Sequence, residues 1–192
     1  MYFNSKVGTF SWRTRRNKER LFVEEYLTLP SPIERSDDLN LLRKVAQAAP
    51  VDAILSYCRY NLLITDMDDL LTPFAKQQGI GLINASPLHM GILTTNGPPP
   101  WHPASPEVKE AGRSLAQRYG ARLSDLALQF CLAHPYIATT LAGMSTVEQV
   151  RQNVAAAAIP ADAALTAEIR SLVSPVANRS WPSGLPENQD AS

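Results

Sequence analysis

A short apolar run that ends at a serine and a proline constrains this chain more than any other feature. Residues 79–94 read GIGLINASPLHMGILT, and the stretch at 80–85 is almost continuously apolar rather than alternating. A continuous apolar run of this length is typical of a parallel strand that is buried on both faces. Ser86 follows the run directly, and Pro87 cannot continue the strand pairing. We therefore expect a hydroxyl and a backbone N–H at the carboxyl end of a parallel strand, where α/β proteins bind their ligands.

Two further apolar runs predict parallel strands, at 51–57 and 137–142. Helical patterns separate the three runs, and capping residues or acidic side chains mark several of their starts. The expected helices run from Asp37 or Asp38 to the residues before Pro50, from the acidic cluster at 65–69 to Gln78, from Pro106 to Gly120, from Ser124 or Asp125 onward, from a capping box at 145–148, and over 160–173. Strands and helices alternate with short joints, so we expect a parallel sheet of right-handed βαβ units.

The number of strands favours part of a larger fold. Three parallel strands leave two unpaired edges, which is a hazard for aggregation unless something covers them. A complete eight-stranded βα barrel needs about 250 residues, whereas this chain has 192. We therefore expect part of a barrel, with a small self-contained three-layer fold as the alternative. The expected division is an irregular basic segment at 1–37, a partial barrel at 38–175 and an irregular tail at 176–192.

Charge and hydropathy exclude several classes of partner. The first twenty residues carry six basic side chains against one glutamate, which can indicate nucleic-acid binding or organelle import but more often marks a solvated chain end. Further along there is no basic face and no aromatic residue interleaved with arginine, so we expect no nucleic-acid partner. No apolar run is long enough to cross a bilayer, so we expect no membrane span. Cys58 and Cys131 lie in apolar segments, which predicts buried thiols in a reducing compartment and a cytoplasmic location.

Five segments form an ordered set that goes beyond these general patterns. They are VDAILSYCRYNLL at 51–63, GIGLINASPLHMGILT at 79–94, GPPPWHPASPEVKEAG at 97–112, LAGMSTVEQVRQNVAAA at 141–157 and WPSG at 181–184. The set resembles the aldo-keto reductase family, and within it the group of L-galactose and aldose dehydrogenases. The resemblance implies an α/β fold, namely the C-terminal half of a (β/α)8 TIM barrel with about three parallel strands and surrounding helices. It also implies a nicotinamide dinucleotide, NAD or NADP, as cofactor.

The resemblance further implies that the cofactor lies across the carboxyl ends of the strands. The implied cofactor-binding residues are Tyr57 for the nicotinamide carboxamide, Ser86, Pro87 and Leu88 for the pyrophosphate and its ribose, Gly143, Met144 and Ser145 for the adenosine end, and Gln149 and Asn153 for the adenine side. Each has an ordinary structural alternative: Ser145 can cap a helix, Ser86 can form a turn, Tyr57 can pack in its strand, and the two amides can be solvated. Many family members grip the 2′-phosphate of NADP with a basic residue at the position of Gln149, and a neutral amide favours NAD.

Hydride transfer in this family needs a tyrosine as general acid–base, a lysine that lowers its pKa, and an aspartate and a histidine beside them. No segment here matches those four positions, so we expect no catalytic residues and an inactive C-terminal half of a reductase for a sugar or small carbonyl substrate. Trp101 and His102, in the long loop after Ser86, are the expected substrate loop. His134, before Pro135, is expected to end a helix. No histidine pair has metal-ligand spacing, so we expect no metal site.

Two other functions stay open at this point. A non-catalytic module could bind the cofactor, or could bind another half-barrel through its open sheet edges. A small flavodoxin-like domain is the third alternative, although no phosphate loop supports it.

Overall fold

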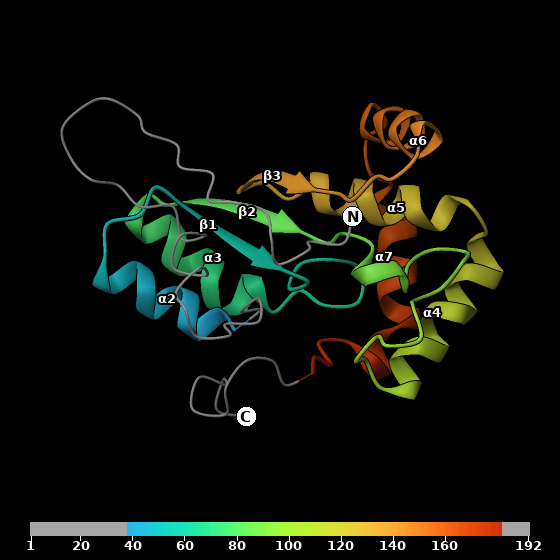
Figure 1. The fold of residues 1–192 in the computed structure, drawn as a ribbon, viewed down its shortest axis with the longest axis horizontal. Helices are drawn as coiled ribbons and strands as arrows, with labels where there is room; N and C mark the ends of the chain where they lie inside the picture. The colour runs from blue at the N-terminus through green and yellow to red at the C-terminus, as the bar shows by residue number, and fades with distance from the viewer. Residues whose placement is uncertain (1–37, 182–192) are drawn as a thin grey trace.

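Three strands form one parallel sheet in the computed structural model, which describes residues 38–181 (Figure 1). The strands are β1 (Ala53–Tyr57), β2 (Gly81–Ala85) and β3 (Ile137–Leu141), and β2 lies between the other two. Each strand is one or two residues shorter than the apolar run that predicts it. The parallel pairing confirms the predicted fold class, an α/β partial barrel.

Two helices cover one face of the sheet beside β1 and β2: α2 (Leu39–Ala48) and α3 (Met67–Gln78) (Figure 1). Asp38 caps α2, because its side chain accepts a hydrogen bond from the Leu41 amide at 2.9 Å. α3 ends at Gly79, whose φ of 67° is the left-handed conformation that glycine adopts at little cost. The core between these helices and the sheet contains Leu39, Leu42, Ile54, Met67, Leu71, Ile80 and Leu82.

Three further helices form a second core beside the sheet: α4 (Pro106–Tyr119), α5 (Arg122–Leu132) and α7 (Ala163–Leu172). Two short 3₁₀ turns contribute to it, η1 (His89–Gly91) after β2 and η2 (Ser174–Val176) after α7. α4 approaches the chain after β2 so closely that Gly112 has no room for a side chain. A Cβ at Gly112 would lie 2.9 Å from the carbonyl oxygen of Ile92. The buried side chains of this core include Leu62, Leu63, Ile64, Leu93, Val108, Leu115, Leu123, Ile169 and Val176.

The starts of two helices differ from the prediction. α5 begins at Arg122 rather than at Ser124 or Asp125, because the Gly120 carbonyl accepts a bond from the Leu123 amide at 3.1 Å and replaces a side-chain cap. α6 (Val147–Ala157) is capped by Thr146, one residue later than predicted, since the Thr146 hydroxyl accepts from the Gln149 amide at 3.2 Å. The N-cap is therefore Thr146, and the Gln149 side-chain oxygen accepts from the Ser145 amide rather than from the Thr146 amide. The predicted box at 145–148 places the cap one residue early.

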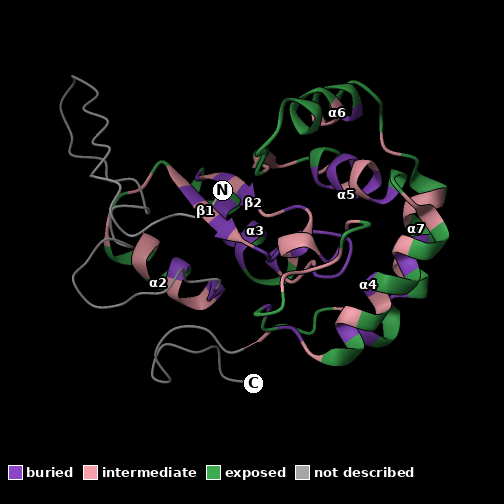
Figure 2. Cartoon of the chain, turned by 45° about the vertical axis from the view of Figure 1, so that its right-hand side comes forward, coloured by how far each residue is buried: buried purple, intermediate pink, exposed green. Residues whose placement is uncertain are grey.

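α6 lies at the periphery of the molecule, and Figure 2 shows that most of its residues are exposed. It packs on α5 through one side. On the opposite side Val147 and Val154 are each 66% exposed and Val150 is 43% exposed. These three valines, together with Leu141 and Met144 before the helix, leave an apolar surface in contact with solvent.

The ends of the predicted domains are only partly covered by the described residues. The basic segment at 1–37 and residues 182–192 of the tail lie outside them. Residues 177–181 follow η2 without helix or strand, and Val176, the last residue of η2, is buried in the second core. No described helix has the length and apolar character needed to span a bilayer.

Candidate functional site

The carboxyl ends of the three strands lie level with one another. Tyr57 pairs with Ala85, and Ala85 pairs with Leu141, so the chain leaves all three strands at the same edge of the sheet. This edge brings together Tyr57, the loop that starts at Ser86, and the segment before α6. Tyr57, Ser86 and the segment at 143–145 therefore lie at or just after the same ends of the strands, whereas Gln149 and Asn153 lie further along, in α6.

Ser86 forms a turn at the end of β2. Its amide donates to the Leu141 carbonyl at 3.2 Å, and its carbonyl accepts from the His89 amide at 3.0 Å. Its hydroxyl oxygen accepts a hydrogen bond from the Met90 amide at 3.1 Å. The turn alternative is thus correct, and the same hydroxyl keeps its own proton to donate to a ligand. Of the two residues that follow, Pro87 is buried and Leu88 is half-buried.

The loop from Ser86 to Gly91 has an unusual backbone. φ is 65° at Ser86, 49° at His89, 50° at Met90 and 100° at Gly91. Three of these residues carry a Cβ, and the left-handed conformation costs such residues about 1 kcal/mol or more each. Strain of this kind persists only where neighbouring groups fix the backbone, and it is concentrated at functional sites.

The segment before α6 is open to solvent. Gly143 and Ser145 are exposed, and Met144 is 41% exposed. The Gln149 side-chain oxygen accepts from the Ser145 amide at 2.7 Å and from the Ser145 hydroxyl at 3.1 Å. Ser145 is therefore not the cap, and Gln149 uses its oxygen within the helix start. Asn153, one turn further along, is half-buried.

His89 and His102 form a buried pair beneath the loop. The Asn61 side-chain amide lies 3.1 Å from His89 Nδ1, and His102 Nε2 lies 3.2 Å from the His89 carbonyl oxygen. The Ala104 amide donates to His102 Nδ1 at 3.1 Å. Both rings therefore carry their proton on Nε2 and are neutral. Burial lowers the pKa of His89 to about 3 and also lowers the pKa of His102.

The two predicted substrate-loop residues differ in solvent exposure. Trp101 is 57% exposed, whereas His102 is 3% exposed and its ring points toward His89. An exposed Trp101 is compatible with the substrate-loop prediction. His102 contacts the loop after β2 through His89.

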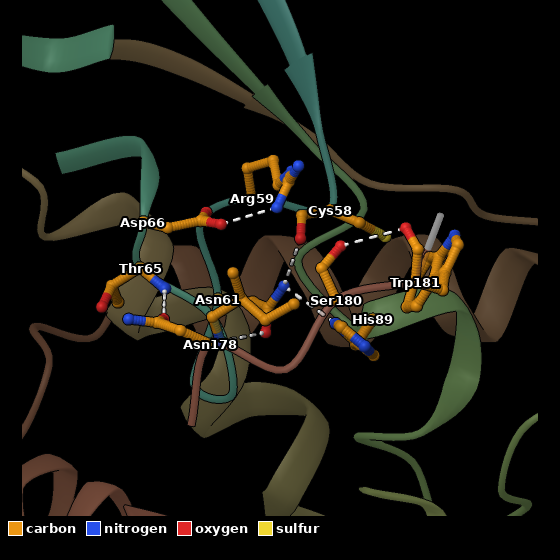
Figure 3. Close-up of polar contacts among 10 residues, drawn as sticks. Cys58, Arg59, Asn61, Thr65, Asp66, His89, Asn178, Ser180 and Trp181 are labelled. Atoms are coloured by element: carbon orange, nitrogen blue, oxygen red, sulfur yellow. Dashed lines mark hydrogen bonds and ion pairs between the residues drawn. The ribbon is translucent and has the colours of Figure 1, made fainter. Parts of the chain in front are cut away.

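Asn61 organises the loop after β1, and the sequence analysis missed it. Its side-chain oxygen accepts from the Leu63 amide at 3.0 Å and from the Ile64 amide at 3.2 Å. Its side-chain amide faces the Cys58 carbonyl at 3.5 Å and His89 Nδ1 at 3.1 Å (Figure 3). The side chain is completely buried. A signal was present in the sequence, because a single asparagine interrupts the apolar run at 60–64.

The residues after η2 hold the same loop from the other side. The Asn178 amide donates to the Leu63 carbonyl at 3.0 Å, and its side-chain oxygen accepts from the Thr65 amide at 2.8 Å (Figure 3). Trp181 then lies edge-on to both histidines, with ring centroids 5.3 Å from His89 and 5.3 Å from His102. Sequence reasoning treated this stretch as an irregular tail and gave it no role.

Neither Tyr60 nor Tyr136 has the surroundings of a general acid–base. Tyr60 is stacked on Phe130 at 5.0 Å, and burial together with the charge of Asp68 raises its pKa. Tyr136 has Lys76 over its ring at 5.4 Å, but its hydroxyl donates to the carbonyl of Ile80, which precedes β2. Tyr136 therefore lies at the amino end of the sheet, opposite the candidate site.

His134 and the two cysteines pack inside the fold. His134 does more than end a helix, because its Nε2 lies 2.9 Å from the Asp68 carboxylate and its Nδ1 accepts from the Tyr136 and Ile137 amides. Cys58 and Cys131 are buried and form no disulfide, as predicted, and burial raises the pKa of Cys131 to about 12. No cluster of three potential metal ligands occurs within residues 38–181.

Comparison with known proteins supports a common origin for this arrangement. The sequence matches the family described as the Aldo/keto reductase family over residues 35–174. It is 45% identical over 145 residues to L-galactose dehydrogenase from Arabidopsis thaliana, a match that covers 72% of this chain and 45% of that protein. It is 28% identical over 151 residues to NADH-specific methylglyoxal reductase from Escherichia coli (strain K12), covering 69% of this chain and 46% of that protein.

A solved structure agrees with the sequence matches. The apo form of aldo-keto reductase AKR11C1 from Bacillus halodurans superposes with a TM-score of 0.55 at 25% identity, covering 80% of this chain and 52% of that chain. The chain thus spans about half the length of the relatives that it matches.

Proposed function

The chain belongs to the aldo/keto reductase family of oxidoreductases, and from this premise we propose that the carboxyl edge of its sheet binds a nicotinamide dinucleotide. The observation that carries the proposal is the register that brings Tyr57, Ala85 and Leu141 level. Ligands of α/β proteins bind at this edge. The bound group would supply or accept the hydride in the interconversion of a sugar or small alcohol with its carbonyl form.

The residues at the edge have the chemistry that such a ligand needs. Ser86 has a hydroxyl proton to donate to a pyrophosphate oxygen, and Pro87 and Leu88 shape the wall beside it. Residues 143–145 lead into the amino end of α6, and helix starts favour anions. Tyr57, at the last position of β1, would contact the nicotinamide carboxamide.

We propose NAD rather than NADP as the preferred form. Gln149 carries no positive charge for a 2′-phosphate, and its oxygen is used by Ser145. Arg151, two positions further along α6, points to a different side of the helix. A bidentate basic grip on the phosphate is therefore lacking at the predicted position.

A titration tests this proposal. We expect NADH to bind the purified chain more tightly than NADPH does, as measured by isothermal calorimetry. Ser86→Ala should weaken NADH binding about tenfold, because a hydrogen bond to a charged group is worth about 1.5 kcal/mol. Ser171→Ala, an exposed serine on α7, is the matched control and should bind like the wild type. Absence of binding of both nucleotides, or equal affinities of the two serine variants, contradicts the proposed site.

We also propose that this chain does not turn over substrate by itself. The support is the unsuitable setting of Tyr60 and Tyr136, and the lack of a segment that matches the family's tyrosine, lysine, aspartate and histidine. The chain would then act as a half-barrel that binds a partner, which is the second candidate function. Among residues 38–181 no strand pairs with the outer edge of β3, and Leu141 and the valines of α6 are exposed. These features favour the half-barrel function, since unpaired strand edges and exposed apolar side chains are typical of an interface.

The partner proposed for this surface is a polypeptide that carries the first half of an aldo/keto reductase barrel. The relatives are about twice as long as the matched region, so such a half is what this surface would meet in them. We expect the first half of Arabidopsis thaliana L-galactose dehydrogenase to co-sediment with the chain when the two are co-expressed. Val147→Lys with Val154→Lys should abolish co-sedimentation, whereas Ala155→Lys, on the flank of α6, should preserve it. Separate sedimentation of the wild-type chain and the added half refutes the pairing.

A further inference from the structure

The loop that carries Ser86, Pro87 and Leu88 needs an external restraint. Its three left-handed residues other than glycine are costly, and inside the loop few bonds oppose that cost. They are the bonds from the His89 and Met90 amides to Ser86, and from the Gly91 amide to the Leu88 carbonyl. At the ends of the loop the Ser86 amide bonds to the Leu141 carbonyl, and the Ile92 and Leu93 amides bond to the His89 and Leu88 carbonyls. Such short turn bonds alone do not select one strained conformation, because each is worth only about 1 kcal/mol.

The His89 side chain supplies a connection from the loop to the rest of the molecule. Asn61, in the loop after β1, contacts the Nδ1 atom of His89 with its side-chain amide. His102, in the loop before α4, contacts the His89 carbonyl oxygen with its Nε2 atom. The two imidazole rings stack at 5.8 Å with an interplanar angle of 29°. The His89 ring has no exposed surface, so the loop cannot leave its conformation without withdrawing this ring from its pocket.

Trp181 closes that pocket. Its ring meets both imidazoles at the same distance and the same interplanar angle of 77°. Its position is fixed by Asn178, three residues earlier, which is bonded to the backbone of Leu63 and Thr65. Figure 3 shows Asn178, Ser180 and Trp181 running past Asn61 to His89. The irregular segment after η2 is thus tied at one end to the loop after β1 and covers the histidine pair at the other.

We propose that Trp181 is a positioning residue for nucleotide binding, which acts through His89 and His102 to hold the loop at Ser86–Leu88 in its strained, binding-competent conformation. The inference rests on the proposed nucleotide site. The segment after η2 would thus support a loop that lies almost a hundred residues earlier in the sequence.

The proposal predicts how the loop behaves without the ring. When a fraction of molecules leaves the competent conformation, the apparent dissociation constant rises by the inverse of the competent fraction. In Trp181→Ala we expect a tenfold loss of NADH affinity by calorimetry. We also expect at least tenfold faster hydrogen exchange of the His89 and Met90 amides, which are bonded to Ser86. Trp181→Phe, which keeps an aromatic edge against the histidines, should recover both to within about twofold of the wild type.

A control separates positioning from general stability. Val176→Ala truncates a buried side chain of the same segment in the second core without touching the histidine rings. It should lower the urea midpoint of unfolding but leave NADH affinity and the exchange of the His89 and Met90 amides unchanged. Trp181→Leu, which keeps an apolar side chain but removes the aromatic ring, serves as the loop variant if the alanine variant does not fold, and it should behave as predicted for alanine.

The outcomes are distinguishable from those of the proposed function. Failure of the wild-type chain to bind NADH and NADPH overturns the nucleotide site, while the exchange rates still show whether Trp181 holds the loop. Unchanged exchange in Trp181→Ala and Trp181→Leu overturns the positioning role, whether or not nucleotide binds. Val176→Ala that matches Trp181→Ala in affinity and exchange also overturns it, because the effect would then be one of stability alone.

Discussion

Replacement of Asn61 by leucine is expected to lower the free energy of unfolding by about 4 kcal/mol, although the two side chains have the same branched arrangement of heavy atoms. The substitution removes the acceptor of the Leu63 and Ile64 amides and the donor that faces Cys58 and His89. Each buried polar group left without a partner costs about 1–3 kcal/mol, and leucine regains part of this through its apolar surface. Urea denaturation followed by circular dichroism measures the change.

The control for this prediction is the same substitution at a site without such bonds. Asn153 is half-buried on α6, and leucine is the better helix former. Asn153→Leu should therefore change stability by less than about 0.5 kcal/mol. A loss below 1 kcal/mol in Asn61→Leu would mean that the loop after β1 is held by its apolar contacts and not by this asparagine.

The parts of the fold that could be predicted are those with a local origin. The apolar run at 80–85 predicts β2, and Ser86 with Pro87 marks its end, because strand burial and proline chemistry depend on consecutive residues. Once the strands are taken as parallel, their carboxyl ends are expected to lie side by side, as Tyr57, Ala85 and Leu141 do. Even so, the capping box was placed one residue early, since Ser145 and Thr146 are both good caps and only the tertiary path of the chain distinguishes them.

The contacts that fix the candidate site have no local origin. Asn61, His89, His102 and Trp181 are brought together from four separate loops, and no periodic pattern links them. The substrate-loop prediction for His102 rests on its place in the long loop after Ser86, but the structure turns its ring inward against the His89 carbonyl. The sequence predicts an irregular tail, and an irregular segment can still pack when its backbone groups find partners.

The buried histidines also predict how the protein responds to acid. Burial holds His89 neutral with a pKa of about 3, whereas an unfolded chain protonates the same imidazole near pH 6.5. Between these values the unfolded state binds one more proton than the native state, so stability is fully present above about pH 6.5 and is lost as the pH falls toward 3. The slope from His89 alone is up to about 1.4 kcal/mol per pH unit. His102 adds to the loss in the same direction, because burial and the charge of Lys109 lower its pKa as well.

A single variant isolates this contribution from that of the carboxylates. His89→Asn removes the titrating ring and suits the left-handed backbone at this position, because asparagine tolerates a positive φ. We expect its unfolding free energy, measured in urea at steps between pH 7 and pH 4, to fall less steeply than that of the wild type. The two curves should converge toward the acid end, since the variant is less stable at neutral pH but has no buried imidazole to protonate. Parallel curves would show that His89 takes up its proton in the native state as readily as in the unfolded state, which would contradict a buried ring held neutral beneath Ser86.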